Sequence, residues 1–243
     1  MKLSPSEKFY ARVISCLEES SIPFLIGGSY AARNYFGPKR NLKDLDILCL
    51  PRDARKILNC AEKAGFEVEM TNPRWLGKIF NSTDYVDVIF STSNGKIKLE
   101  EDWFERSKPL SLFGIKTRAI SPEDMILTKM YVFGRDCFHG HDIYKLIKRY
   151  HSQINWRRLL KTVGKDHLVF SAHVALFDFV FPRETEKIPD WFRKKLATLK
   201  KPSRKNRAER AFRGKELSLI DYKAPSSSPI YNHPLRKKAR SKR

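Results

Sequence analysis

A short apolar run that stops at two consecutive glycines is the feature that most limits how this chain can fold. Phe24-Leu25-Ile26 is typical of a buried strand, and Gly27-Gly28 directly after it indicates a tight turn. Ser29–Tyr35 then has the pattern of a short helix. A strand, a glycine turn and a helix in this order bring free backbone N–H groups and the positive end of a helix dipole to one point. The order favours phosphate binding, to which the hydroxyl of Ser29 can add a hydrogen bond.

Three carboxylates follow at positions where strands are expected. Asp44 and Asp46 lie at the start of a predicted strand that ends at Leu50, and residues two apart on a strand point to the same face. Asp87 lies inside Tyr85–Phe90, a strong β pattern in which a lone buried carboxylate is costly. If the two strands are neighbours, the three carboxylates converge and require a cation. Oxygen ligands of this kind suit Mg²⁺, and two ions about 3.5–4 Å apart can serve an in-line displacement.

Each of these features has a common alternative interpretation. Gly27-Gly28-Ser29 is compatible with a plain turn, and Asp44-Leu45-Asp46 with a solvated strand end or a helix cap. Asp87 alone could be a core carboxylate bonded to the backbone or to an arginine. All three occur in the order and spacing that one active site needs, so we favour a joint site.

Periodicity divides the chain into a mixed part, a helical part and a tail. Residues 1–120 predict an α/β (α+β) core with a twisted mixed sheet flanked by helices, residues 121–200 a helical region, and residues 201–243 a basic tail without regular structure. Further strands are predicted at Phe66–Met70, Ile79–Phe80 and Ile115–Ile120. Helices are predicted after caps at Ser4 and Asp53, and at Pro122–Phe133, His141–Tyr150, Trp156–Val163, Leu168–Phe179 and Pro189–Leu199.

The charge of the chain is strongly positive and unevenly placed. The formal net charge is +21, and residues 200–243 hold 15 Lys and Arg against three Asp and Glu. Such a tail attracts polyanions such as RNA, although basic tails also serve solubility alone. No window is apolar enough for a membrane span and the N-terminus has no apolar signal core, so we expect a cytoplasmic protein.

The cysteines and histidines do not follow the spacing of a zinc site or a disulfide framework. Cys16, Cys49, Cys60 and Cys137 form no CxxC pair, and we expect buried or inert thiols. His139 and His141 are expected to be surface or hydrogen-bonded residues.

The pattern Gly27-Gly28-Ser29, then Arg40-x-x-x-Asp44-Leu45-Asp46 and a later strand Asp resembles the DNA polymerase β-like nucleotidyltransferase superfamily. The similarity points to its minimal and AbiEii-like branches and covers about residues 20–199. Ser121-Pro122-Glu123-Asp124-Met125-Ile126-Leu127-x-Lys129 is similar to the helix that follows the core in those proteins, and Phe138–Ile143 resembles their Asp-Gly-Ala-Asp-Val segment. Leu42 departs from the Thr or Ser that the family often has two residues before the first Asp.

The resemblance implies a reaction and roles for single residues. It implies Mg²⁺, for which Mn²⁺ can substitute, held by Asp44 and Asp46, with Asp87 as the third carboxylate that helps to activate an acceptor hydroxyl. It also implies a nucleotide site that includes Lys129 facing the triphosphate, together with Arg40, Arg135 and Asp142. Lys129 could instead be a solvated helix residue, and Arg135 and Asp142 a structural ion pair.

The implied activity is transfer of a nucleoside monophosphate from an NTP to a hydroxyl, with release of pyrophosphate. The net charge favours the 3′ end of an RNA as acceptor, although a protein hydroxyl or a small molecule fits as well. A non-catalytic RNA-binding protein on the same fold and a member of a toxin–antitoxin pair are the alternatives.

Overall fold

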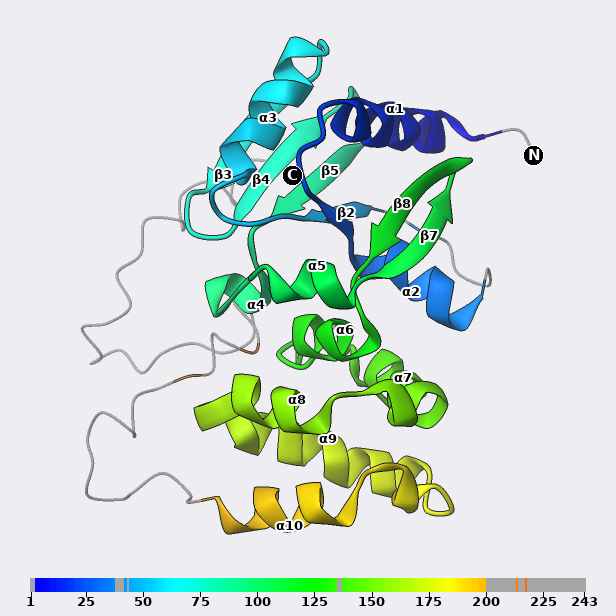
Figure 1. The fold of residues 1–243 in the computed structure, drawn as a ribbon, viewed down its shortest axis with the longest axis vertical. Helices are drawn as coiled ribbons and strands as arrows, with labels where there is room; N and C mark the ends of the chain where they lie inside the picture. The colour runs from blue at the N-terminus through cyan, green and yellow to red at the C-terminus, as the bar shows by residue number, and fades with distance from the viewer. Residues whose placement is uncertain are drawn as a thin grey trace, which may run out of the picture.

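The computed structural model describes residues 3–37, 42, 44–134, 137–199, 213 and 217. Within these residues, seven strands form one mixed sheet in the order β3-β4-β5-β2-β1-β8-β7 (Figure 1). The pairs β2–β5 and β1–β8 are parallel, and the other neighbours are antiparallel. The strands are β1 (Leu25–Ile26), β2 (Leu45–Leu48), β3 (Glu67–Asn72), β4 (Leu76–Phe80), β5 (Tyr85–Ile89), β7 (Lys108–Leu112) and β8 (Ile115–Ala119), while the two-residue β6 (Ile97–Lys98) lies outside this sheet.

Helices cover the sheet and then continue as a separate stack. The helices α1 and α3 contact each other and the strands β8, β3 and β4, whereas α2 contacts β2, α6 and α7. From α6 onward the chain is helical, and Figure 1 shows α6 to α10 layered below the sheet, with α10 furthest from it. The helices are α1 (Pro5–Glu19), α2 (Gly28–Phe36), α3 (Ala54–Lys63), α4 (Thr92–Gly95), α5 (Asp102–Arg106), α6 (Pro122–Lys129), α7 (Gly140–Tyr150), α8 (Trp156–Val163), α9 (His167–Val180) and α10 (Asp190–Thr198).

Local sequence signals explain where the main helices begin and which face they bury. The Ser4 hydroxyl accepts a hydrogen bond from the Glu7 N–H while the Glu7 side chain accepts from the Ser4 N–H, which is a capping box. At the start of α6 the Ser121 hydroxyl likewise accepts a hydrogen bond from the Asp124 N–H. The apolar positions of α1 recur at helical spacing and are buried in the core: Phe9, Tyr10, Val13, Ile14 and Leu17.

Ionic contacts join the helical part to the end of the core. Asp124, in α6, is fully buried and accepts hydrogen bonds from Arg106 of α5 at 3.3 Å and from Arg158 of α8 at 2.8 Å. Arg158 also donates to Asp102 at 3.2 Å. A buried carboxylate is stable only with such partners, so this network fixes three helices relative to one another.

The structure corrects several boundaries predicted from the sequence. The helix predicted over Pro122–Phe133 ends at Lys129, and Phe133 instead forms an isolated bridge with Phe138. The strand predicted from Asp46 to Leu50 spans Leu45–Leu48. Asp53 precedes α3 but makes no capping bond: its backbone is helical, with φ −100° and ψ −13°, where a capping residue is usually extended, and its carboxylate accepts a hydrogen bond from Lys56. No helix in the described part of the chain is long and apolar enough to cross a membrane.

Candidate active site

The two central parallel strands place two of the predicted carboxylates side by side. Asp46 on β2 is directly opposite Asp87 on β5 in the strand register. Both side chains lie on the same face of the sheet, because residues paired in register point the same way. Strands β2 and β5 therefore bring together residues that are 41 positions apart in the sequence.

The glycine turn after β1 packs against Asp46 on the side of β2 opposite to β5. The Gly27 N–H donates to the Asp46 carbonyl at 2.9 Å. Gly28 begins α2 with a φ of +52°, and a Cβ at this position would lie 1.6 Å from the Asp46 carboxylate oxygen Oδ2. Only a glycine allows both the left-handed backbone and this approach. The N-terminus of α2 is thus held directly beside Asp46.

Burial and mutual repulsion make the acidic pair electrostatically unfavourable. Burial raises the pKa of Asp46 to about 7, and the neighbouring carboxylate of Asp87 adds to the rise. Burial likewise raises the pKa of Asp87, although the ammonium of Lys78 acts in the opposite direction. Two adjacent carboxylates with raised pKa values are the environment that a bound cation relieves.

Asp44 lies just before β2 and is partly buried. Asp44 acts on Tyr85, the first residue of β5. Burial raises the pKa of the Tyr85 hydroxyl, and the nearby carboxylate of Asp44 raises that pKa further. Asp44 therefore belongs to the same end of the sheet as the pair. Among the residues that the structure describes, however, no three His, Cys, Asp or Glu side chains are grouped closely enough to hold a metal ion.

Two lysines supply positive charge to this acidic end of the sheet. The ammonium of Lys129, on α6, is 3.1 Å from the Asp142 carboxylate on α7, and both side chains are buried. Lys129 also acts on Asp46, whose pKa it lowers against the effects of burial and of Asp87. The resemblance had pointed to Lys129 and Asp142 as site residues, and the structure places both in one ion pair near the acidic pair.

Lys78 is the residue that the sequence analysis missed. It lies on β4 opposite Asp87 in register, and its ammonium is 2.5 Å from the Asp87 carboxylate. Asp87 had been expected to have a backbone or arginine partner if it was not a site residue, and its observed partner is this lysine. An alternating pattern through β4 could have indicated which face Lys78 occupies, but not that β4 lies beside β5.

The remaining predicted residues lie at the edge of the site or outside the described chain. Ser29 is partly exposed in the first turn of α2. Arg40 and Arg135 lie outside the described residues. His139 is close to Cys137, with 3.2 Å between Nε2 and Sγ.

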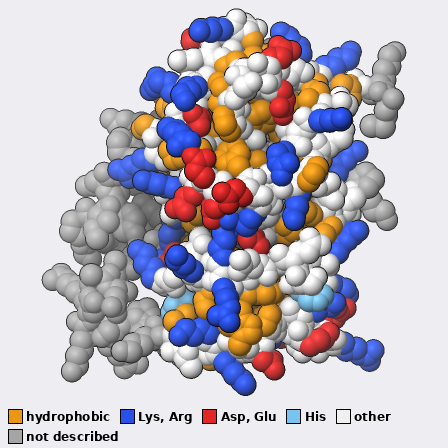
Figure 2. All heavy atoms as spheres, viewed as in Figure 1, with side chains coloured by type: hydrophobic (Ala, Val, Ile, Leu, Met, Phe, Trp, Pro, Cys, Tyr) orange, Lys and Arg blue, Asp and Glu red, His pale blue; other side chains and the backbone are white. Residues whose placement is uncertain are grey.

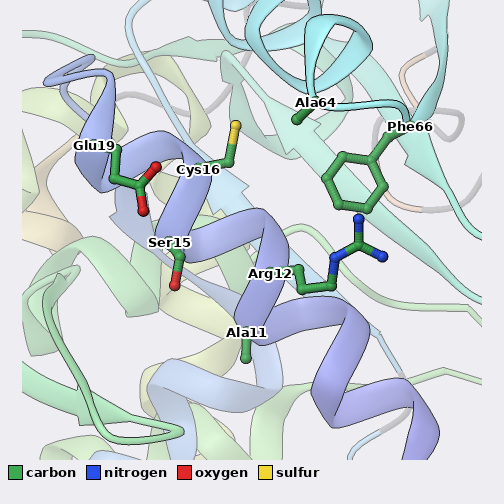
Figure 3. Close-up of a pocket in the computed structure, with 7 residues that line it drawn as sticks. All are labelled: Ala11, Arg12, Ser15, Cys16, Glu19, Ala64 and Phe66. Carbon is green, nitrogen blue, oxygen red and sulfur yellow. The ribbon is translucent and has the colours of Figure 1, made fainter.

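A separate cavity lies away from these residues, between α1 and the start of β3. Its volume is about 290 Å³, and it is lined by Ala11, Arg12, Ser15, Cys16, Glu19, Ala64 and Phe66 (Figure 3). The guanidinium of Arg12 lies over the Phe66 ring (Figure 3), with 4.9 Å between its Cζ atom and the ring centre. None of the predicted site residues lines this cavity, so it is not the candidate active site.

Comparison with known families decides the class of the protein. A family model described as "Uncharacterised nucleotidyltransferase" matches residues 9–176, which is more than half of the chain and includes the glycine turn, the three carboxylates, Lys129 and Asp142. The chain belongs to this nucleotidyltransferase family. The mixed sheet with flanking helices is consistent with the fold that the resemblance implied.

Several solved structures are similar to part of this chain. A lincosamide antibiotic adenylyltransferase with lincomycin bound is 17% identical, with a TM-score of 0.43, over 60% of this chain and 98% of that chain. The ANT(2″)-Ia protein in complex with adenylyl-2″-tobramycin is 14% identical, with a TM-score of 0.45, over 73% and 99%. The CCA-adding enzyme of Bacillus stearothermophilus in complex with CTP is 12% identical, with a TM-score of 0.32, over 77% and 55%. A search of curated proteins found no match.

Proposed function

We propose that this nucleotidyltransferase moves a nucleoside monophosphate from an NTP to an acceptor hydroxyl in a Mg²⁺-dependent reaction that releases pyrophosphate. The observation that supports this most directly is Asp46, held opposite Asp87 and against Gly28 at the start of α2. It puts an acidic pair and a helix N-terminus at one place, which are the two elements that a metal-bound triphosphate needs.

The donor chemistry of the acidic pair fits a hard divalent cation. Carboxylate oxygens are the ligands that Mg²⁺ prefers, and the raised pKa values of Asp46 and Asp87 reflect two carboxylates that are buried close to other acidic groups. In our proposal Asp44 and Asp46 hold the ion and Asp87 completes the set, which requires the three carboxylates to move closer together than they lie in this structure. Bound there, Mg²⁺ supplies charge neutralisation for the phosphate and the reacting oxygens.

The residues of the chain then have separate roles. The N–H groups at Gly28 and Ser29 and the dipole of α2 bind the triphosphate, and Lys129, oriented by Asp142, neutralises part of its charge. The acceptor oxygen forms a bond to the α-phosphorus while the bond from that phosphorus to the bridging oxygen breaks, so pyrophosphate leaves. Asp87 takes the proton of the acceptor hydroxyl, a role that its raised pKa suits. Arg40 and Arg135 are proposed as further phosphate contacts.

For the acceptor we favour the 3′ end of an RNA. The net charge of +21 supports this choice. Lys and Arg side chains are spread over the face shown in Figure 2, while a group of acidic side chains lies near mid-height, at the level of α4 and α5 in Figure 1. A polyanion can therefore gain contacts on the folded part as well as on the tail.

Transfer of label from each α-³²P-NTP tests the proposal. The protein is incubated with Mg²⁺ and total cellular RNA, and RNA and protein are then separated on gels beside an Asp44→Ala/Asp46→Ala variant. We expect label on RNA that is absent with the variant. Label on a protein band would keep the reaction and change the acceptor. If no NTP gives label, and NTP with Mg²⁺ leaves the melting temperature unchanged, the catalytic proposal is wrong and the non-catalytic RNA-binding alternative takes its place.

A further inference from the structure

Lys78 is positioned as a counter-ion built into the acidic site. In the order β4-β5-β2, Lys78, Asp87 and Asp46 occupy successive register positions, so Asp87 lies between the ammonium and the second carboxylate. The ammonium is 2.5 Å from the Asp87 carboxylate and 3.6 Å from the centre of the Tyr85 ring. The side chains of Lys78 and Asp87 are each only 20% exposed.

These contacts hold the lysine more firmly than a surface ion pair would. A cation between a carboxylate and an aromatic face gains from both, and partial burial limits the screening of the pair by water. Asp87 is therefore already paired with a cation of the chain itself.

An occupied carboxylate is a poor ligand for a free cation. A divalent cation at Asp87 has to displace the ammonium or share its oxygen with it at a short distance, and the repulsion of the two positive charges opposes either arrangement. A triphosphate changes this balance, because its oxygens offer both the ammonium and the cation further negative charge.

We propose that Lys78 is a positioning residue that holds Asp87 in the nucleotide-free protein and makes divalent-cation binding depend on the nucleotide. The inference rests on the function proposed above and adds the order in which the site fills. Free Mg²⁺ or Mn²⁺ binds weakly to the protein alone, and the cation enters together with the NTP.

Direct measurement of Mn²⁺ binding by electron paramagnetic resonance tests this without any turnover. We compare the wild-type protein with Lys78→Gln and Lys78→Arg, without nucleotide and with a non-hydrolysable α,β-methylene NTP. Without nucleotide, Lys78→Gln is expected to bind Mn²⁺ about tenfold more tightly than wild type, the effect of removing one close positive charge. Lys78→Arg keeps the charge and is expected to stay within about threefold of wild type. The nucleotide analogue is expected to remove most of the difference.

Two controls separate this effect from a general change in charge. Lys56→Gln removes a lysine from a Lys–Asp pair outside the site, in which the Lys56 ammonium is 2.8 Å from the Asp53 carboxylate. This variant is expected to leave Mn²⁺ binding unchanged. Lys78→Gln/Asp87→Asn is expected to lose the gain, because the gain requires a freed Asp87 carboxylate. If Lys78→Gln folds poorly by circular dichroism, Lys78→Met keeps the length of the side chain over Tyr85 and takes its place.

The outcomes distinguish this inference from the proposed function. Equal Mn²⁺ affinity of wild type and the uncharged Lys78 variants without nucleotide overturns the role of Lys78, even where nucleotide and Mn²⁺ bind together as proposed. If neither the wild type nor any Lys78 variant binds Mn²⁺ in the presence of the NTP analogue, the proposed function itself is wrong.

Discussion

At the scale of single residues, Gly28 serves both the backbone conformation at the start of α2 and the close packing of this turn against Asp46. Its Cβ would overlap the Asp46 carboxylate, and its φ of +52° is unfavourable for other residues. We expect Gly28→Ala to abolish nucleotidyl transfer and to cost about 2 kcal/mol or more of unfolding free energy. Chemical denaturation and the label-transfer assay measure the two effects.

Gly65→Ala is the matched control for this substitution. Gly65 has a φ of +84°, but a Cβ there would meet no atom within 4 Å. It should cost about 1 kcal/mol through backbone strain alone and leave transfer intact. Equal loss of transfer in the two variants would contradict a specific role for Gly28.

Asp46 should make the metal-free protein less stable as the pH rises. Its folded-state pKa of about 7 lies above the unfolded value of about 3.9. Its contribution to stability is therefore fully present below about pH 4 and is lost as the pH rises through about 7. In EDTA at pH 8, Asp46→Asn should raise the unfolding free energy by about 2 kcal/mol, a value that allows for solvent screening of a partly buried group. The gain should vanish near pH 4.

Asp166 provides a control of opposite sign. Hydrogen bonds from Lys96, Tyr131 and Arg213 outweigh the effect of burial and hold its pKa at about 2. Its stabilisation is present above the unfolded pKa and is lost as the pH falls toward 2. Asp166→Asn should thus lower the unfolding free energy by about 2 kcal/mol at pH 7. Denaturation at a series of pH values would contradict both assignments if the two variants shifted in the same direction.

At the scale of helices and strands, the contact between α1 and α3 contains a thiol pair that the cysteine spacing did not indicate. The Sγ atoms of Cys16 and Cys60 are 3.3 Å apart. A two-electron oxidant such as diamide can take up the two thiol hydrogens and leave a disulfide that joins the helices. We expect this cross-link to raise the unfolding free energy by about 2–4 kcal/mol. Burial raises the pKa of the Cys16 thiol to about 11, so oxidation should be slow at pH 7 and faster toward pH 10.

Peptide mapping under non-reducing conditions checks which thiols react. Cys16→Ser and Cys60→Ser should each prevent the cross-link, whereas Cys49→Ser and Cys137→Ser should leave it intact. Recovery of alkylated Cys16 and Cys60 after diamide treatment, with dimers formed through the exposed Cys137, would show that the pair does not close.

Elements with a strong local signal could be predicted from the sequence, and those defined by distant partners could not. The capping box at Ser4 and the β pattern of Tyr85–Phe90 both appear in the structure as α1 and β5. The strand β7 was missed, since Lys108-Pro109 interrupts its pattern and its stability comes from pairing with β8. Lys78 was missed for the same reason: its partner Asp87 is chosen by the register of β4 and β5, which no local pattern specifies.

At the scale of the whole molecule, the charge is the property that bears on the choice of acceptor. Arg213 pairs with Asp166, and the Leu217 carbonyl accepts a hydrogen bond from the Phe133 N–H at 3.3 Å, so these two residues contact the folded part. Residues 218–243 hold seven further Lys and Arg and one Asp. Deletion of 218–243 therefore removes basic charge while keeping both contacts.

The salt dependence of RNA binding shows whether this charge is used. Each phosphate contact contributes about 0.7 to the slope of log affinity against log salt for single strands. If the tail binds RNA, deletion of 218–243 should reduce that slope by up to about 5, whereas Asp44→Ala/Asp46→Ala should leave it unchanged and remove only transfer. Fluorescence anisotropy with a labelled RNA between 50 and 300 mM salt measures both. An unchanged slope after the deletion would assign residues 218–243 to solubility. RNA contacts would then have to come from the basic residues that precede them, because the acidic pair itself repels the phosphate backbone.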